Sequence, residues 1–317
     1  MRVLFVCSGN SVCGISPIII NQASALTGNL DALSIDFFPI VGKGIRGYAK
    51  NISLLKSKLK GESYDIVHAH YSLSAFAASL AGAKPLIVSL MGSDVKASYY
   101  YKLIIKLFQY IFSWKVIIVK SEDMKRSLNS QNAIVVPNGV SFNRFFPMNK
   151  EHCRENLNWN PSKKHLLFTS NPNRKEKNYV LTKQAIELLN DKDIELHSLV
   201  NVPNEQTPIW YNAADVVILT SLWEGSPNAI KEAMACNRPI VSTNVGDVSW
   251  LLGDLSGCFL TEFNAKECAE SIDKAIQFSL EKGETCGRER LIELGLENSQ
   301  VAETIASIYM AVIKILQ

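Results

Sequence analysis

The chain has 317 residues, of which 47% are hydrophobic and 20% are charged, as in an average soluble globular protein. This composition excludes wholesale disorder, a collagen repeat and a small disulfide scaffold. The formal net charge of +3, from 33 basic and 30 acidic side chains, is too small at this length to indicate nucleic acid as a partner. The length allows two domains of about 150 residues, or one α/β barrel of roughly 250 residues with additions.

The seven cysteines are scattered along the chain, and no two have the C-x2-C spacing of a zinc site. They favour free thiols in a reducing compartment. The first residues enter a strand pattern at once, without the cleavage site of a signal peptide. We therefore expect a cytoplasmic protein.

Short apolar runs alternate with helix-length segments along the whole chain. In the first half, strands are expected at 3–7, 33–40, 66–70, 86–90, 116–119 and 134–136. In the second half, they are expected at 165–169, 194–200, 216–220, 240–243 and 258–261. Nearly continuous apolar strands joined by helices are typical of parallel sheets covered on both faces. The sequence therefore predicts an α/β protein of two doubly wound parallel-sheet units.

One segment, at 143–161, has two prolines, mixed charge and no strand pattern, and we place the domain boundary there. The predicted division is an N-terminal domain at 1–150, a C-terminal domain at 151–298 and a final helix at 299–317. Apolar residues of that helix recur at three- and four-residue steps, which gives it a face that can pack back on the N-terminal domain.

The segment 99–115 is helical by length and unusually apolar. Its polar positions are only Lys102, Lys106, Gln109 and Ser113. Such a helix is either buried against the sheet and a neighbour or lies in a lipid interface. The strand that follows at once favours burial, and peripheral membrane contact stays open as the alternative.

The turn after the first strand has Gly9 and Gly14 at the spacing of a phosphate loop, but Ile15-Ser16 stands where Lys-Ser or Lys-Thr is required. This excludes a nucleoside-triphosphatase loop. What remains is a glycine-containing strand-to-helix turn. Its backbone N–H groups either face an anion or a sugar, with Gly14 and Asn10 as the candidates, or need glycine only for its dihedral angles.

The strongest pattern follows the strand at 216–220. A short loop leads to a helix that begins close to Pro227, a residue favoured in the first helical turn. The first backbone N–H groups of a helix have no intrahelical acceptor and can bind an anion. The donor-binding candidates at this helix start are Ser226, Pro227, Asn228, Ala229 and Ile230.

Two glutamates flank the same helix start. Glu224 lies just before the helix and Glu232 lies inside it. Carboxylates are poor phosphate ligands, but they accept hydrogen bonds from the hydroxyls of a sugar and a ribose on either side of a diphosphate. The alternative is that both are solvated side chains on a helix edge.

These residues resemble the signature of glycosyltransferase family 4, which consists of retaining, nucleotide-sugar-dependent enzymes of the GT-B fold. The signature is Glu224-x7-Glu232 followed by Ala233-Met234-Ala235-Cys236-Asn237-Arg238-Pro239-Ile240-Val241. Other landmarks in the family's order are Asp65-Ile66-Val67-His68-Ala69-His70-Tyr71, Gly92-Ser93-Asp94-Val95, Val136-Pro137-Asn138-Gly139-Val140 and Phe145-Phe146-Pro147. The resemblance implies two Rossmann-like domains facing each other across a cleft, with the nucleotide mostly on the second and the acceptor mostly on the first.

The resemblance also implies roles for single residues on the donor side. Glu232 would bind the ribose hydroxyls, and Glu224 would lie near the donor sugar. Lys177 fits the family's lysine that grips the diphosphate. Pro172 occupies the position of the family's arginine, and Arg174 is expected to supply that charge from a shifted place.

On the acceptor side, Met91 stands where the family often has a histidine. His70 is then the candidate for a polar contact with sugar or acceptor, against the alternative of a satisfied core histidine, while His68 is expected inside. Asp94 either accepts from a sugar hydroxyl or caps a helix. Asn10 completes the acceptor-side candidates.

Only fifteen residues separate the strands at 194–200 and 216–220, where the family commonly has a further helix and strand. The wall for the nucleobase is therefore either formed by 200–204, with Val202 as the candidate, or reduced.

We thus expect a retaining glycosyltransferase of the hexosyl- or N-acetylhexosaminyl-transferase class. It would move a sugar from a nucleotide-diphosphate-sugar donor to a glycan or lipid-linked acceptor in cell-surface polysaccharide assembly. It would need no metal or other cofactor and would work in the cytoplasm or at the inner face of the cell membrane. The alternatives are a sugar-nucleotide epimerase of similar fold and a non-catalytic sugar-nucleotide-binding protein.

Overall fold

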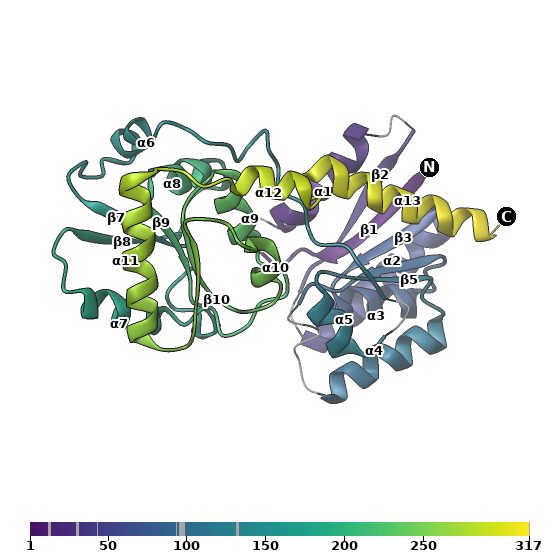
Figure 1. Cartoon of the computed structure of the whole chain (residues 1–317). Helices are drawn as coiled ribbons and strands as arrows, with labels where there is room; N and C mark the ends of the chain where they lie inside the picture. Colours follow the sequence, from purple (N-terminus) through teal and green to yellow (C-terminus); the bar gives the residue numbers. More distant parts are fainter. Residues whose placement is uncertain are drawn as a thin grey trace. The chain divides into compact units, whose positions relative to one another are not determined.

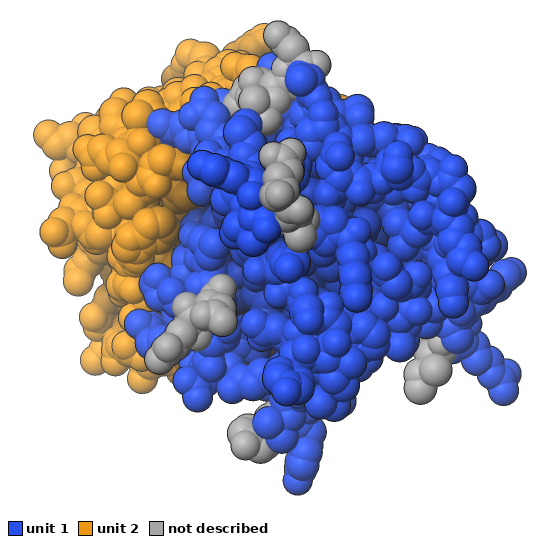
Figure 2. All heavy atoms as spheres, turned by 90° about the vertical axis from the view of Figure 1, so that its right-hand side faces the viewer, with its two compact units in different colours: residues 1–139, 298–317 blue, residues 140–297 orange. Residues whose placement is uncertain are grey.

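The computed structural model describes residues 1–11, 14–29, 32–42, 44–92, 94, 99–130 and 133–316. The chain forms two compact units, coloured separately in Figure 2: unit 1 comprises Met1–Gly139 and Asn298–Gln317, and unit 2 comprises Val140–Glu297. Each unit has a wholly parallel sheet. The predicted fold class of two doubly wound α/β units is confirmed.

The sheet of unit 1 has the strand order β2-β1-β3-β4-β5-β6 (Figure 1). Its strands are β1 (Arg2–Ser8), β2 (Ser34–Ile40), β3 (Ile66–His70), β4 (Leu86–Ser89), β5 (Val116–Val119) and β6 (Ala133–Val135). Its helices are α1 (Pro17–Asn29), α2 (Gly44–Gly61), α3 (Ser72–Ala81), α4 (Tyr99–Phe112), α5 (Glu122–Leu128) and α13 (Asn298–Leu316). Every residue of β3 and β4 is buried, as expected for central strands covered on both faces.

The sheet of unit 2 has the order β11-β10-β9-β7-β8. Its strands are β7 (Lys164–Phe168), β8 (Ile194–Ser198), β9 (Val216–Leu219), β10 (Ile240–Thr243) and β11 (Cys258–Thr261). Its α-helices are α6 (Lys150–Leu157), α7 (Tyr179–Leu189), α8 (Thr207–Ala213), α9 (Asn228–Ala235), α10 (Val248–Leu252), α11 (Ala265–Glu281) and α12 (Gly287–Glu293). Two 3-10 turns, Lys175–Lys177 and Asn204–Gln206, complete it. The strands expected from the apolar runs are all present, with ends shifted by at most about two residues.

The chain passes from unit 1 to unit 2 between Gly139 and Val140, ahead of the boundary segment expected from the prolines. The residues after this point are tied to unit 2 by polar contacts. The Arg288 guanidinium donates to the carbonyl oxygens of Phe145, at 2.8 Å, and of Phe142, at 3.2 Å. These tertiary bonds have no signature in the local sequence, so composition placed the boundary too late.

The last helix, α13, belongs to unit 1, where it packs against α1. Its Tyr309 is fully buried, and the Tyr309 hydroxyl lies 2.6 Å from Nδ1 of His68. Nε2 of His68 lies 2.8 Å from the Ser89 hydroxyl. His68 is therefore a core histidine with both ring nitrogens satisfied, as expected.

Helix α4 is apolar on two faces. Ile105 is buried, and Tyr101, Phe108 and Phe112 pack against the same core. The face opposite exposes only apolar and aromatic side chains, namely Tyr100, Leu103, Ile104, Leu107, Tyr110 and Ile111. The expectation of burial thus holds for one face only. Within the described residues, no helix is both long and apolar enough to cross a membrane.

Candidate functional site

The strand order of unit 2 points to one end of its sheet. β7 lies between β8 and β9, so the connections from β7 and from β8 run in opposite directions across the sheet. In doubly wound sheets, ligands bind at such a reversal, outside the carboxyl ends of the strands. The segments at that place are 169–178, after β7, and 220–227, after β9.

These two segments bring together two of the predicted residues. Nζ of Lys177 lies 2.5 Å from Oε1 of Glu224, and the same carboxylate oxygen accepts from the Ser221 hydroxyl at 2.7 Å. The Lys177 and Glu224 side chains are only 16% and 14% exposed. A cation and a carboxylate, 47 positions apart in sequence, therefore meet at the carboxyl edge of the sheet.

Backbone contacts hold this pair in place. The Leu222 N–H donates to the Glu176 carbonyl at 2.8 Å, and the Thr220 hydroxyl donates to the Lys177 carbonyl at 3.2 Å. On the other side, Gly246 has a φ of +63°, and a Cβ there would lie 2.5 Å from the Gly225 carbonyl oxygen. Only glycine permits this close approach of the two loops.

Helix α9 begins next to the pair. It starts at Asn228, directly after Pro227, and no side chain caps it. Its first N–H groups, those of Asn228, Ala229 and Ile230, have no acceptor within the helix. Oδ1 of Asn228 is buried without a hydrogen-bond partner among the described residues. The helix start predicted close to Pro227 is therefore present in the structure, and its binding of an anion stays a prediction.

Glu232 is held by a residue that the sequence analysis did not name. Its Oε2 accepts from the hydroxyl of fully buried Tyr211 at 2.9 Å. Burial raises the pKa of the Glu232 carboxyl, although the Tyr211 hydroxyl and the charges of Arg144 and Lys231 oppose this shift. The Arg144 guanidinium itself donates to Oδ1 of Asn204 at 2.6 Å.

A buried lysine underlies the helix start. Lys231 is fully buried, and its Nζ donates to the Ser226 hydroxyl at 3.1 Å. Burial lowers the Lys231 pKa to about 8, although the charges of Asp247 and Glu232 raise it. The buried Lys231 side chain thus orients the hydroxyl of the candidate Ser226.

Two donor-side candidates are not brought to this cluster. The Arg174 guanidinium is 55% exposed and pairs with Oε1 of Glu176 at 2.7 Å, so the expected second cation is engaged on the surface. Val202 is partly exposed in the loop after β8, and the structure gives it no contact to the Lys177–Glu224 pair. The ion pair of Arg174 with Glu176 could have been predicted from the sequence, because the two residues are only two positions apart.

In unit 1, the corresponding strand reversal lies between β1 and β3, and His70 ends β3. His70 is 1% exposed, its ring stacks at 4.3 Å on that of His68, and neither of its ring nitrogens has a hydrogen-bond partner among the described residues. Burial, aided by the Lys120 charge, lowers its pKa to about 3, so the imidazole is neutral at pH 7. The next residue, Tyr71, has a φ of 81°, a strained conformation of the kind found at functional sites.

The other unit 1 candidates are engaged by the protein itself. The carboxylate of buried Asp94 accepts backbone N–H groups of Ser72 at 3.2 Å and of Met91 and Gly92 at 3.0 Å, so it serves the first turn of α3 and the preceding loop. Burial raises its pKa, against these N–H donors. Of the two predicted roles, this geometry favours the helix cap.

Hydrogen bonds within the turn after β1, and from it to the loop after β2, use the polar groups of the candidates there. The Asn10 amide donates to the Gly42 carbonyl at 3.1 Å, and the Gly42 N–H donates back to Asn10 Oδ1 at 2.9 Å. Gly14, with a φ of +79°, donates its N–H to the Ser11 carbonyl at 3.0 Å. The Gly14 N–H is therefore used by the turn, which favours the conformational role of this glycine. Val12, Cys13, Ser93 and Val95 of the predicted motifs lie outside the described residues.

Sequence reasoning missed Tyr211 and Arg144. Tyr211 lies on α8, a seven-residue helix that the sequence analysis did not name. Pro208, in the first turn of this helix, was an available signal. Arg144 contributes through its charge near Glu232, which follows from tertiary placement alone.

The cluster in unit 2 offers a cation and free helix N–H groups for anionic oxygens, with carboxylates of Glu224 and Glu232 beside them for hydroxyl groups. Positive groups arranged in advance stabilise negative charge that develops on a leaving group. This combination suits a sugar joined to a nucleoside through a diphosphate.

Comparison with known sequences agrees with this geometry. The family model described as "Glycosyltransferase Family 4" matches residues 25–144, and the model described as "Glycosyl transferases group 1" matches residues 162–277. A putative teichuronic acid biosynthesis glycosyltransferase, TuaC of Bacillus subtilis, is 27% identical over 250 residues, which cover 70% of this chain and 64% of that protein. An Escherichia coli UDP-Gal:alpha-D-GlcNAc-diphosphoundecaprenol alpha-1,3-galactosyltransferase is 26% identical over 303 residues, covering 78% of this chain and 76% of that one.

Solved structures share the fold at low sequence identity. The sucrose-phosphate synthase of Thermosynechococcus elongatus has a TM-score of 0.80 at 14% identity and covers 99% of this chain and 100% of its own. Anabaena HepE, solved in complex with UDP-glucose, has a TM-score of 0.75 at 14% identity, covering 98% of this chain and 100% of that chain. With family models matching both halves of the chain and the fold shared over its length, this protein belongs to the family 4 glycosyltransferases of the GT-B fold.

Proposed function

We propose that this protein is a retaining glycosyltransferase that moves a sugar from a nucleotide-diphosphate-sugar donor to a glycan or lipid-linked acceptor. The observation that carries the proposal is the contact of Lys177 with Glu224 beside the uncapped start of α9. In this proposal the cation and the N–H donors bind the diphosphate, and the carboxylate accepts from a sugar hydroxyl. No metal ion or other cofactor is required by this scheme, since Lys177 and the helix start supply the positive field.

The chemistry follows from that placement. The bond between the anomeric carbon and the diphosphate oxygen breaks, and negative charge grows on the leaving nucleoside diphosphate. Lys177 stabilises this charge more in the transition state than in the ground state. The acceptor oxygen attacks from the face that the leaving group vacates, and its proton passes to a phosphate oxygen of the leaving group. Glu224 then holds a sugar hydroxyl, and Glu232 holds the ribose hydroxyls.

The acceptor is proposed from the relatives and from the surface of unit 1. The names of the two relatives described above refer to teichuronic acid biosynthesis and to a diphosphoundecaprenol acceptor. We extend to this chain a role in cell-surface polysaccharide assembly, with a polyprenyl-diphosphate-linked glycan as acceptor and the cytoplasmic face of the membrane as the place of work.

Two features of unit 1 support a lipid-linked acceptor. The exposed face of α4 carries Leu107 at 54% and Tyr110 at 84% exposure, in a row of six apolar or aromatic side chains. In the same unit, an apolar cavity of about 540 Å³ is lined by residues of α2, α3 and α4, namely Tyr48, Ala49, Ile52, Leu73, Phe76, Ala77, Leu80 and Phe108. An aromatic and apolar helix face is typical of contact with a lipid interface.

The donor assignment is tested by nucleotide affinity. Thermal-shift screening of a panel of nucleoside diphosphates is expected to identify one that stabilises the chain by mass action. Glu232→Ala is then expected to weaken that nucleotide by about 10- to 100-fold in calorimetry, because a hydrogen bond to a charged group contributes about 1.5–3 kcal/mol. The matched control Glu187→Ala removes an exposed glutamate of the same unit and leaves the affinity unchanged.

An unchanged affinity in Glu232→Ala would show that the ribose assignment is wrong. Failure of every nucleoside diphosphate to bind would overturn the proposed function itself. A chain that binds the nucleotide but releases no free nucleotide, when given donor sugar and acceptor, would instead be an epimerase or a binding protein.

The membrane contact is tested separately. The double variant Ile104→Glu, Leu107→Glu is expected to lower co-sedimentation with anionic phospholipid vesicles at least about tenfold, because each large apolar side chain contributes about 1.5–3 kcal/mol when buried. Leu280→Glu, at an exposed leucine of α11 in unit 2, is the matched control and should bind like the unaltered chain. Equal vesicle binding by all three proteins would remove α4 from the interface.

A further inference from the structure

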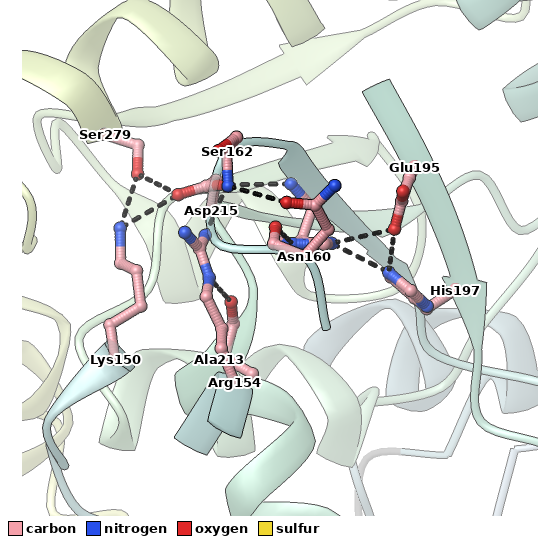
Figure 3. Close-up of polar contacts among 10 residues, drawn as sticks. Lys150, Arg154, Asn160, Ser162, Glu195, His197, Ala213, Asp215 and Ser279 are labelled. Carbon is pink, nitrogen blue, oxygen red and sulfur yellow. Dashed lines mark hydrogen bonds and ion pairs between the residues drawn. The ribbon is translucent and has the colours of Figure 1, made fainter. Parts of the chain in front are cut away.

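One group of three metal-ligating side chains gathers within the described residues: His165, Glu195 and His197. His165 lies near the start of β7, and the other two lie on the neighbouring strand β8. The pairing of the strands sets His165 directly opposite Glu195. Figure 3 shows the side chains of Glu195 and His197 pointing toward each other.

The ligand atoms have the spacing that a single small cation bridges. Nδ1 of His165 lies 2.9 Å from Nε2 of His197. Oε2 of Glu195 lies 3.6 Å from the first nitrogen and 3.9 Å from the second. A circle through three atoms with these separations has a radius of about 2.0 Å, the length of a Zn–N or Zn–O bond.

The outer contacts orient His165 for metal binding. Its Nε2 lies 2.8 Å from the Asn160 carbonyl oxygen, to which it can only donate. The proton of the neutral ring is therefore on Nε2, and the lone pair of Nδ1 faces Glu195 and His197. A histidine ligand whose second nitrogen donates to a backbone carbonyl is the usual arrangement at zinc sites.

His197 is held as firmly. Its ring stacks on Trp159 with centroids 3.6 Å apart and an interplanar angle of 8°, and the Trp210 ring stands edge-on to Trp159.

The three-residue cluster contacts the protein on one side and is accessible to solvent at Glu195 and His197. Figure 3 shows Asp215 next to it, and the Asp215 carboxylate pairs with both Lys150 and Arg154. The His165 backbone N–H donates to Asp215 at 2.8 Å. The Glu195 side chain is 40% exposed and that of His197 is 18% exposed, which leaves a path for an ion and for a water ligand.

We propose that His165, Glu195 and His197 bind one Zn²⁺ ion, with water completing the coordination. The ion joins β7 to the edge strand β8 and, through Asn160, to the segment before β7, so its role is structural. Binding moves the His197 proton from Nε2 to Nδ1, and neither ring loses its proton to solvent. The site is independent of the proposed donor chemistry.

The test uses the full chain, first stripped with a chelator and then titrated with ZnCl₂ in calorimetry at pH 7. One equivalent is expected to bind with micromolar affinity or better and to raise the melting temperature by several degrees. Co²⁺ in place of Zn²⁺ should give the visible d–d bands of a four-coordinate site. Neither readout needs donor, acceptor or activity, so failure here leaves the proposed function standing, and the reverse also holds.

The variants His197→Ala and Glu195→Gln assign the ligands. Each is expected to weaken Zn²⁺ binding at least about tenfold and to abolish the cobalt bands. His152→Ala is the matched control, because it removes an exposed histidine of the same unit, on α6, whose ring lies 3.7 Å from Glu155. It should bind Zn²⁺ like the unaltered chain.

Three outcomes would overturn the site. These are the absence of stoichiometric binding to the stripped chain, unchanged affinity in His197→Ala, and equal losses in His152→Ala and His197→Ala. If His197→Ala fails to fold, Glu195→Gln decides, since that side chain is partly exposed and the amide keeps its shape.

Discussion

Lys177→Ala is expected to lower kcat by about 10²–10³-fold with the fold intact, the loss typical when one preorganised donor to a developing negative charge is removed. KM for the donor should change less, because Lys177 acts mainly on charge that appears in the transition state. The measurement is the rate of nucleoside diphosphate release, in the presence of acceptor, at saturating and limiting donor. Circular dichroism and urea unfolding check the fold.

Lys175→Ala is the matched control. Lys175 is exposed and belongs to the same 3-10 turn, so it tests whether any positive charge there suffices. Its kcat should match that of the unaltered enzyme. Glu224→Gln is the companion variant, since it removes the charge that now pairs with Lys177 at 2.5 Å. Full turnover by Lys177→Ala would leave the diphosphate without its proposed cation.

Asp215→Asn is expected to lower the free energy of unfolding of unit 2 by about 3–5 kcal/mol, the cost of leaving buried charges without their partner. The carboxylate binds Lys150 at 2.9 Å and Arg154 at 2.6 Å, with side chains 23% and 10% exposed. Asparagine keeps the shape and can still accept the His165 N–H. Urea unfolding followed by tryptophan fluorescence measures the loss, because four of the five tryptophans lie in unit 2.

The pH dependence of this effect has a definite sign. Burial alone would raise the Asp215 pKa, but Lys150, the His165 N–H and Arg154 outweigh it and hold the pKa below its ordinary 3.8. The contribution to stability is therefore complete above pH 3.8 and is lost as the pH falls through the lower, folded-state pKa. The two proteins should converge in stability in that acidic range. Asp193→Asn, in an exposed pair with Lys163, should cause a much smaller loss at neutral pH.

The strands were predictable because burial on both faces leaves a direct mark on the sequence. β9 is apolar over its whole length and fully buried, so it is visible in the sequence as a continuous apolar run. The start of α9 was predictable for a similar reason, since Pro227 has a fixed backbone preference. Local residue types were sufficient at these places.

Other features depend on partners that are distant in sequence. The boundary at Gly139 depends on Arg288, which holds the segment after it within unit 2. The sequence left two roles open for Asp94, a contact with a sugar hydroxyl or a helix cap. The backbone N–H groups of Ser72 and Met91, which donate to its carboxylate, favour the cap. The contact of Lys177 with Glu224 needed the strand order, which places the loops after β7 and β9 side by side. Residue types indicated the candidates, and topology decided which of them meet.

The place of α13 has a consequence for the order of folding on the ribosome. Unit 2 is one continuous stretch of chain. Unit 1, by contrast, includes α13, which is synthesised after all of unit 2. At about 5–20 residues per second, the delay is on the order of ten seconds or more. During that time the nascent unit 1 lacks Tyr309, so Nδ1 of His68 has no native partner, and the surface of α1 that α13 covers stays open. Unit 1, whose sheet is synthesised first, is thus the unit that is completed last.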